Sequence, residues 1–134
     1  MAPPPVAVAA IYAPRHVRVH RYGAAVHLSE YQRRSRATAV YPDAGRNLTY
    51  PALGLCGEAG EAAEKVKKAL RDDGGVLTTE RRDALGCELG DVLWYLAQLA
   101  TEAGLDLDAL AEGNLAKLRS RQERGALAGS GDRR

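Results

Sequence analysis

The chain has 134 residues, of which 19 are Lys or Arg and 17 are Asp or Glu, and its formal net charge is +2. This length suits one domain, and no stretch approaches the roughly 20 apolar residues needed to cross a bilayer. The start also lacks a secretory pattern, because Pro3, Pro4 and Pro5 stand where a basic segment belongs. We therefore expect a single cytoplasmic domain with no membrane partner.

Positive charge is concentrated near the start of the chain. Residues 1–50 contain seven arginines against only two acids, Glu30 and Asp43, which gives this half a net charge of +5. No interleaved aromatic residues and no nucleic-acid-binding motif accompany these arginines. We interpret them as a solvated basic surface and do not expect a nucleic-acid partner.

Residues 1–27 mix Pro-rich, Ala/Val-rich and Arg-rich pieces without sustained periodicity. We expect a poorly ordered arm, with at most a short strand over residues 6–12. A first helix is predicted after it, because Ser29 and Gln32 form a capping-box pattern. This helix should run to about Val40, before Pro42 breaks it.

A second helix is predicted from Pro51, a residue suited to a first helical turn, to about Arg71. Its expected apolar stripe consists of Leu55, Ala62, Val66, Ala69 and Leu70. The sequence Asp-Asp-Gly-Gly at residues 72–75 then predicts a turn.

A third helix is expected to begin with Thr78 or Thr79 as its cap and to end at Gly104. Apolar residues recur at three- and four-residue spacing along it, and others lie outside this stripe. The extra apolar surface indicates a second packing partner, which is either a fourth helix or another subunit.

A fourth helix is predicted from an Asp106 cap to about Gly125, with Leu105 and Leu110 as a hydrophobic staple. Its expected inner face carries Leu107, Leu110, Leu115 and Leu118. Residues 126–134 read as a flexible tail. Because residues 28–125 show no strand alternation, we predict an all-α bundle of about four helices that dimerisation completes.

Two short acidic motifs give the first indication of function. Glu58 and Glu61 are three residues apart in the second predicted helix, and Glu88 and Asp91 have the same spacing in the third. This spacing keeps each pair on one helical face. Glu88 and Asp91 lie in an apolar segment and have no Lys or Arg three or four residues away, so a group outside the local sequence must compensate them.

The two motifs are predicted to meet. At about 1.5 Å per residue, Glu61 lies roughly 15 Å before Arg71, and Glu88 lies roughly 14 Å after Thr79. Antiparallel packing of the two helices would therefore bring four carboxylates together. Oxygen-only ligands favour Mg²⁺, with Mn²⁺ as a substitute. A di-iron site is disfavoured, because all three histidines lie within residues 1–27 rather than in a Glu-x-x-His motif.

Three blocks in order resemble the MazG-like nucleoside triphosphate pyrophosphohydrolases. They are GLCGEAGEAAEK at residues 54–65, ELGDVLWYLA at 88–97 and NLAKL at 114–118. The resemblance covers about residues 28–125. It implies an all-α enzyme that uses Mg²⁺ to cleave a nucleoside triphosphate between its α and β phosphates, releasing a monophosphate and pyrophosphate. It also implies a homodimer or a dimer of dimers.

The resemblance assigns roles to individual residues. The metal ligands it implies are Glu58, Glu61, Glu88 and Asp91, and the implied phosphate contacts are Asn114 and Lys117, with Arg121 as a weaker candidate. Glu61 or Glu64 would hold or accept the proton of the attacking water. Glu64 has an equal alternative as a surface partner of Lys68.

Three further assignments stay open between chemistry and packing. Lys65 and Lys68 could contact phosphate, although pairing with acids one turn earlier on the same helix is favoured. Trp94 could stack on the base, although packing in the core or at a dimer interface is favoured. Tyr31 and Gln32 could also line a base pocket.

Two alternatives to this activity are kept. One is phosphoribosyl-ATP pyrophosphohydrolase activity, which belongs to a related helical fold. The other is a non-catalytic helical assembly module that holds a metal for structure. Turnover of a nucleotide panel separates all three hypotheses.

Overall fold

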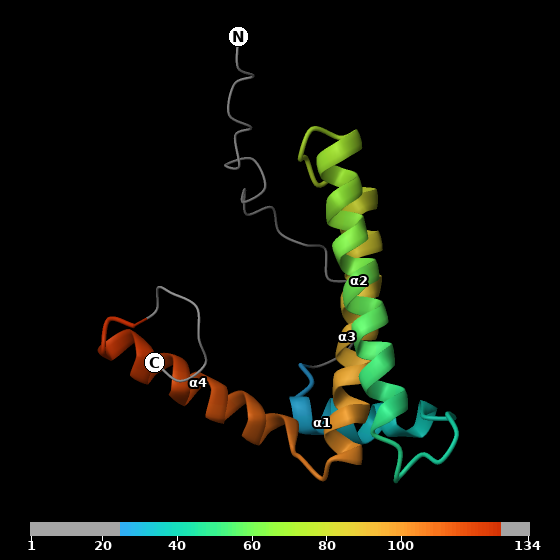
Figure 1. Cartoon of the computed structure of the whole chain (residues 1–134), viewed down its shortest axis with the longest axis vertical. Helices are drawn as coiled ribbons and strands as arrows, with labels where there is room; N and C mark the ends of the chain where they lie inside the picture. Colours follow the sequence, from blue (N-terminus) through green and yellow to red (C-terminus); the bar gives the residue numbers. More distant parts are fainter. Residues whose placement is uncertain (1–24, 127–134) are drawn as a thin grey trace. The chain divides into compact units, whose positions relative to one another are not determined.

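The computed structural model describes residues 25–126, and residues 1–24 and 127–134 lie outside this description. The described range contains four α-helices and one 3-10 turn, and no strand (Figure 1). The elements are α1 (Leu28–Ser35), η2 (Arg36–Thr38), α2 (Thr49–Asp72), α3 (Thr79–Glu102) and α4 (Leu107–Glu123). The prediction of an all-α fold is confirmed. The predicted strand, and almost all of the predicted arm and tail, fall outside the described residues.

The chain divides into two units, which are described separately. The first contains α2 and most of α3, over Thr49–Leu96. The second contains Val26–Leu48, which holds α1 and η2, together with Ala97 and the residues after it, which hold the end of α3 and α4.

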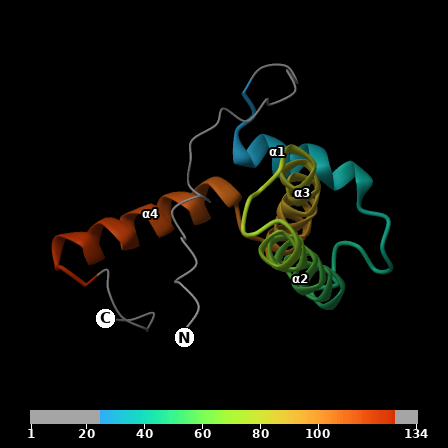
Figure 2. The same cartoon turned by 90° about the horizontal axis from the view of Figure 1, so that it is seen from above.

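In the first unit α2 and α3 form an antiparallel hairpin, and they lie side by side in both views (Figures 1 and 2). Small residues allow this close approach. Ala62 and Ala69 of α2 are buried. At Gly54 a Cβ atom would stand 2.1 Å from a ring carbon of Tyr95, so the ring occupies the space that any larger residue would need.

The turn between α2 and α3 is held by ion pairs and by glycine. Gly74 and Gly75 both have positive φ, +62° and +86°, which glycine adopts without steric cost. Arg81 of α3 donates its Nε to Asp73 at 2.7 Å, back across the turn. The Arg81 amide donates to Thr78 Oγ1 at 3.3 Å, so Thr78 is the cap, one of the two residues that the sequence offered for this role.

In the second unit the last residue of α3, Glu102, organises the loop between η2 and α2. Its carboxylate is fully buried and pairs with Arg36 Nη2 at 2.8 Å. It also accepts a hydrogen bond from Tyr41 Oη at 2.6 Å and from the backbone amides of Gly45 and Asn47 at 2.8 and 3.0 Å. These donors, with that of Tyr41 first, hold the pKa of Glu102 at about 2.

The turn from α3 to α4 follows the predicted local signals. Gly104 has a positive φ of +68°, and the Leu105 amide donates back to the Ala100 carbonyl at 2.8 Å, which closes a Schellman-type helix end. Asp106 accepts a hydrogen bond from the Ala109 amide at 2.9 Å and caps α4. Both predicted helix boundaries are confirmed.

The predicted capping box of the first helix is wrong. Helix α1 begins at Leu28 with His27 as its N-cap, the His27 side chain makes no capping hydrogen bond, and the helix ends at Ser35 rather than Val40. Gln32 instead reaches the turn after α3. Its side-chain amide donates to the Leu105 carbonyl at 2.8 Å and accepts from the Leu107 amide at 2.9 Å.

The apolar stripes are less covered than predicted. On α4 only Leu107 is buried, where it packs with Ala97 and Ala100, whereas Leu115 is 61% exposed. On α2 Val66 and Leu70 are also exposed. Within the described residues the largest fully buried side chains are those of Gln98 and Pro51, so large apolar side chains contribute little to the core of a single chain.

Removing the charge at Glu102 should destabilise the fold. We expect Glu102→Gln to lower the free energy of unfolding by about 2–4 kcal/mol at pH 7, because it leaves Arg36 and the loop amides without their charged partner. Urea denaturation followed by circular dichroism measures this change. Glu112→Gln on the exposed side of α4 is the matched control and should be neutral.

The effect of this substitution should depend on pH. The pKa of Glu102 falls from 4.5 to about 2 in the folded state, so its contribution to stability is complete above about pH 4.5 and is lost as the pH falls toward 2. The difference between wild type and Glu102→Gln should therefore shrink over this interval. A difference that stays constant from pH 7 to pH 2.5 would contradict the network's role.

Candidate active site

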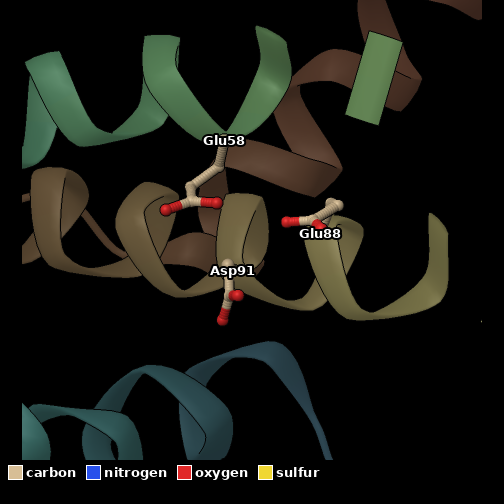
Figure 3. A group of neighbouring side chains, drawn as sticks. All are labelled: Glu58, Glu88 and Asp91. Carbon is tan, nitrogen blue, oxygen red and sulfur yellow. The ribbon is translucent and has the colours of Figure 1, made fainter. Parts of the chain in front are cut away.

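Three of the four motif carboxylates converge between α2 and α3. Glu58 comes from α2, and Glu88 and Asp91 come from successive turns of α3 (Figure 3). One oxygen of each carboxylate lies within 4.8 Å of the others. Glu58 and Glu88 are half-buried and Asp91 is exposed, so the cluster has one side open to solvent.

The cluster carries net negative charge. The pKa of Glu58 is raised, first by desolvation and then by repulsion from Glu61, Asp91 and Glu88. A divalent cation among the three carboxylates would remove this repulsion. All the donors are carboxylate oxygens, which suit a hard cation.

Glu61 lies close to this cluster but outside the group of three. It is exposed on α2, almost one turn beyond Glu58, and its charge contributes to the raised pKa of Glu58. Its role as a fourth metal ligand stays a prediction.

The counter-ion of Glu88 comes from the opposite helix. Lys65 Nζ lies 2.9 Å from Glu88 Oε1, with the two side chains only 26% and 14% exposed. This hydrogen bond is the main cause of the raised pKa of Lys65. The expectation that Lys65 pairs with the acid one turn earlier, Glu61, is therefore wrong, because the hairpin places Glu88 in its reach.

The sequence contained a signal for this ion pair. Lys65 follows Glu61 by about one turn, and the helix heights that brought Glu61 level with Glu88 also brought Lys65 near it. A search for cations on the same helix as Glu88 could not find it, because the partner is on α2.

Glu64 has two lysine partners on its own helix. Its carboxylate oxygens lie 3.3 Å from Lys67 Nζ and 3.5 Å from Lys68 Nζ. These cations lower the pKa of Glu64, and a lowered pKa makes a carboxylate a weaker base. The contacts favour the alternative of a surface ion pair, and a catalytic role for Glu64 stays a prediction.

Trp94 and Tyr95, which are consecutive residues of α3, pack edge to face. Their ring centroids are 4.9 Å apart at an interplanar angle of 88°, and Trp94 is half-buried. Tyr95 in turn lies over Gly54 and near Tyr50. The contacts of Trp94 suit packing, and its stacking on a base stays a prediction.

The remaining predicted residues belong to the second unit. Asn114 and Lys117 lie on the exposed surface of α4, and Arg121 donates its Nε to the Ala126 carbonyl at 3.3 Å. Their phosphate contacts stay predictions. Gln32 uses its side-chain amide at the turn between α3 and α4, where it also lines an open pocket with Arg33 and Arg36, and Tyr31 packs against the small core there. A base pocket at these residues stays a prediction.

Comparison with family models identifies the family of this chain. The model of the MazG nucleotide pyrophosphohydrolase domain matches residues 48–125, a range that contains both acidic motifs. The Gene 37 protein of Mycobacterium phage L5 is 51% identical over 114 residues, which cover 81% of this chain and 100% of the phage protein. No solved structure matches the chain significantly. No helix in residues 25–126 has the length and apolar character needed to cross a membrane. The chain belongs to the MazG nucleotide pyrophosphohydrolase family.

Proposed function

We propose that this chain hydrolyses nucleoside or deoxynucleoside triphosphates to the monophosphate and pyrophosphate, with Mg²⁺ as its cofactor, in the maintenance or regulation of a nucleotide pool. The observation that supports this proposal best is the convergence of Glu58, Glu88 and Asp91 between two helices. Membership of the MazG family gives the reaction class.

The donor set fits Mg²⁺. Glu58, Glu88 and Asp91 offer only carboxylate oxygens, and Glu61 stands near them as a fourth donor. Mn²⁺, which accepts the same ligands, should substitute. When bound, the cation supplies neutralisation of the phosphate charge and a water of lowered pKa.

The other residues bind and orient the substrate in this proposal. Glu61 holds the attacking water and accepts its proton, a role for which Glu64 is less suited because two lysines neutralise it. Asn114 and Lys117 bind phosphate oxygens, with Arg121 one turn further along α4. Trp94 contacts the base.

The substrate panel is the first test. The protein is incubated with each common NTP and dNTP and with phosphoribosyl-ATP in the presence of Mg²⁺, and the products are separated. We expect equal amounts of monophosphate and pyrophosphate from a nucleoside triphosphate. Turnover of phosphoribosyl-ATP alone would assign the other pyrophosphohydrolase activity, and no turnover of any substrate would favour the assembly module.

Removing one carboxylate of the cluster should abolish turnover while the helices persist. We expect Asp91→Asn to lower kcat/KM at least about 100-fold, because the stabilisation of phosphate charge depends on the cation that this ligand holds. Helix content by circular dichroism should be unchanged. Glu80→Gln, at the exposed start of the same helix, is the matched control. Unchanged kcat/KM in Asp91→Asn would exclude this site.

We also propose that a second copy of the chain covers the exposed apolar surface. The buried apolar residues of the described range are mostly alanines, whereas Leu53, Val66 and Leu89 are 68%, 41% and 52% exposed. A core of alanines buries too little apolar surface to stabilise a domain of this size. A homodimer or a dimer of dimers would bury these side chains.

Sedimentation equilibrium tests the oligomer. We expect a mass of two or four times 14.4 kDa at micromolar concentration, because the apolar surface of one chain is incompletely covered. A well-folded species of 14.4 kDa that persists at millimolar concentration would contradict the proposal.

A further inference from the structure

Lys65 occupies an unusual position for a lysine. Its ammonium group lies 2.9 Å from Glu88, one of the three clustered carboxylates, and only 26% of its side chain is exposed. The two other lysines of α2, Lys67 and Lys68, instead pair with Glu64, which lies outside that cluster. Among the ion pairs of the described residues, only that of Lys65 involves one of the three clustered carboxylates.

This position makes Lys65 a competitor of a metal ion. The ammonium group lies on Oε1 of Glu88, and a divalent cation at the cluster would use the same carboxylate. A cation and an ammonium group on the same carboxylate repel each other, and this repulsion is stronger in a partly buried site than in water. Binding of a metal ion therefore favours release of Lys65 from Glu88.

A nucleotide provides Lys65 with a new partner. A triphosphate brings several negative charges to the same space, and a lysine side chain is flexible enough to follow them. An ammonium group at the edge of the cluster can then donate to phosphate oxygens, which are strong acceptors. The positive charge that opposes metal binding would thus promote substrate binding.

We propose that Lys65 is the resident counter-ion of Glu88 in the metal-free protein and that it transfers to the phosphate oxygens of the nucleotide when metal and substrate bind. This inference rests on the proposed function and adds a substrate-binding residue to it. It predicts effects of opposite sign on the affinities for metal and for nucleotide. A purely structural ion pair would not separate them in this way.

The metal arm of the test needs no turnover. Binding of Mn²⁺ alone is measured by electron paramagnetic resonance for wild type, Lys65→Met, Lys65→Arg and the control Lys67→Met. We expect Lys65→Met to bind Mn²⁺ about tenfold more tightly, because the competing charge is gone. Lys65→Arg, which keeps the charge, and Lys67→Met, which removes a charge paired elsewhere, should stay within about twofold of wild type.

The nucleotide arm uses saturating Mn²⁺ and the α,β-methylene analogue of the best substrate from the panel, whose bridging carbon prevents the proposed cleavage. Its dissociation constant is measured by calorimetry. We expect an increase of about tenfold in Lys65→Met, with recovery in Lys65→Arg, because a charged contact to phosphate is lost and then restored. Unchanged or weaker Mn²⁺ binding in Lys65→Met, or unchanged analogue binding, would overturn the proposal.

Failure of this inference is distinguishable from failure of the proposed function. If wild type turns over a nucleotide but Lys65→Met shows no opposite shifts, only the role of Lys65 is overturned. If wild type binds Mn²⁺ but turns over no nucleotide, the proposed function fails, and the transfer of Lys65 to phosphate fails with it. Thermal unfolding of each variant confirms that the affinities come from folded protein.

Discussion

The site depends on the register of the hairpin formed by α2 and α3. Small residues let the two helices approach, and at Gly54 the Tyr95 ring fills the space of a missing side chain. The turn fixes the register from one end, where Arg81 pairs with Asp73. The same register places Glu58 beside Asp91 and Lys65 beside Glu88, so packing and electrostatics are set by one arrangement. A shift of one residue along either helix would turn these side chains by about 100°.

Much of the fold was predictable because its signals are local. The caps at Thr78 and Asp106 and the helix end at Gly104 each depend on residues within one turn of chain, and all three were found from the sequence. The role of Gln32 was predicted wrongly and that of Glu102 was not predicted, because the partners of both residues lie far away in the chain. Gln32 matched a capping pattern, yet its amide caps a turn more than 70 residues later. Sequence rules for helix capping consider only residues within about one turn, so they cannot predict a hydrogen bond to a distant part of the chain.

The sequence was enough to predict that the two acidic motifs meet, but not which side chains contact them. Two acidic motifs at equal helix heights predicted that four carboxylates converge, and the structure brings three of them together, Glu58, Glu88 and Asp91. The sequence did not indicate that Glu61, which is exposed, lies outside this group of three. It also missed the partner of Glu88, since helical spacing rules consider cations on the same helix and Lys65 is on the other. The helix arithmetic applied to all charged residues, rather than to acids alone, would have found it.

Clustered acids and a nearby lysine impose opposing demands on this site. Three carboxylates within 4.8 Å of one another repel each other, and the pKa of Glu58 is raised first by desolvation and then by this repulsion. A protein that relied on metal alone would be least stable before the metal arrives. One ammonium group on Glu88 offsets part of the repulsion, yet it leaves Glu58 and Asp91 available. Partial compensation of this kind reduces the repulsion without closing the site, whereas a lysine on every carboxylate would block metal binding.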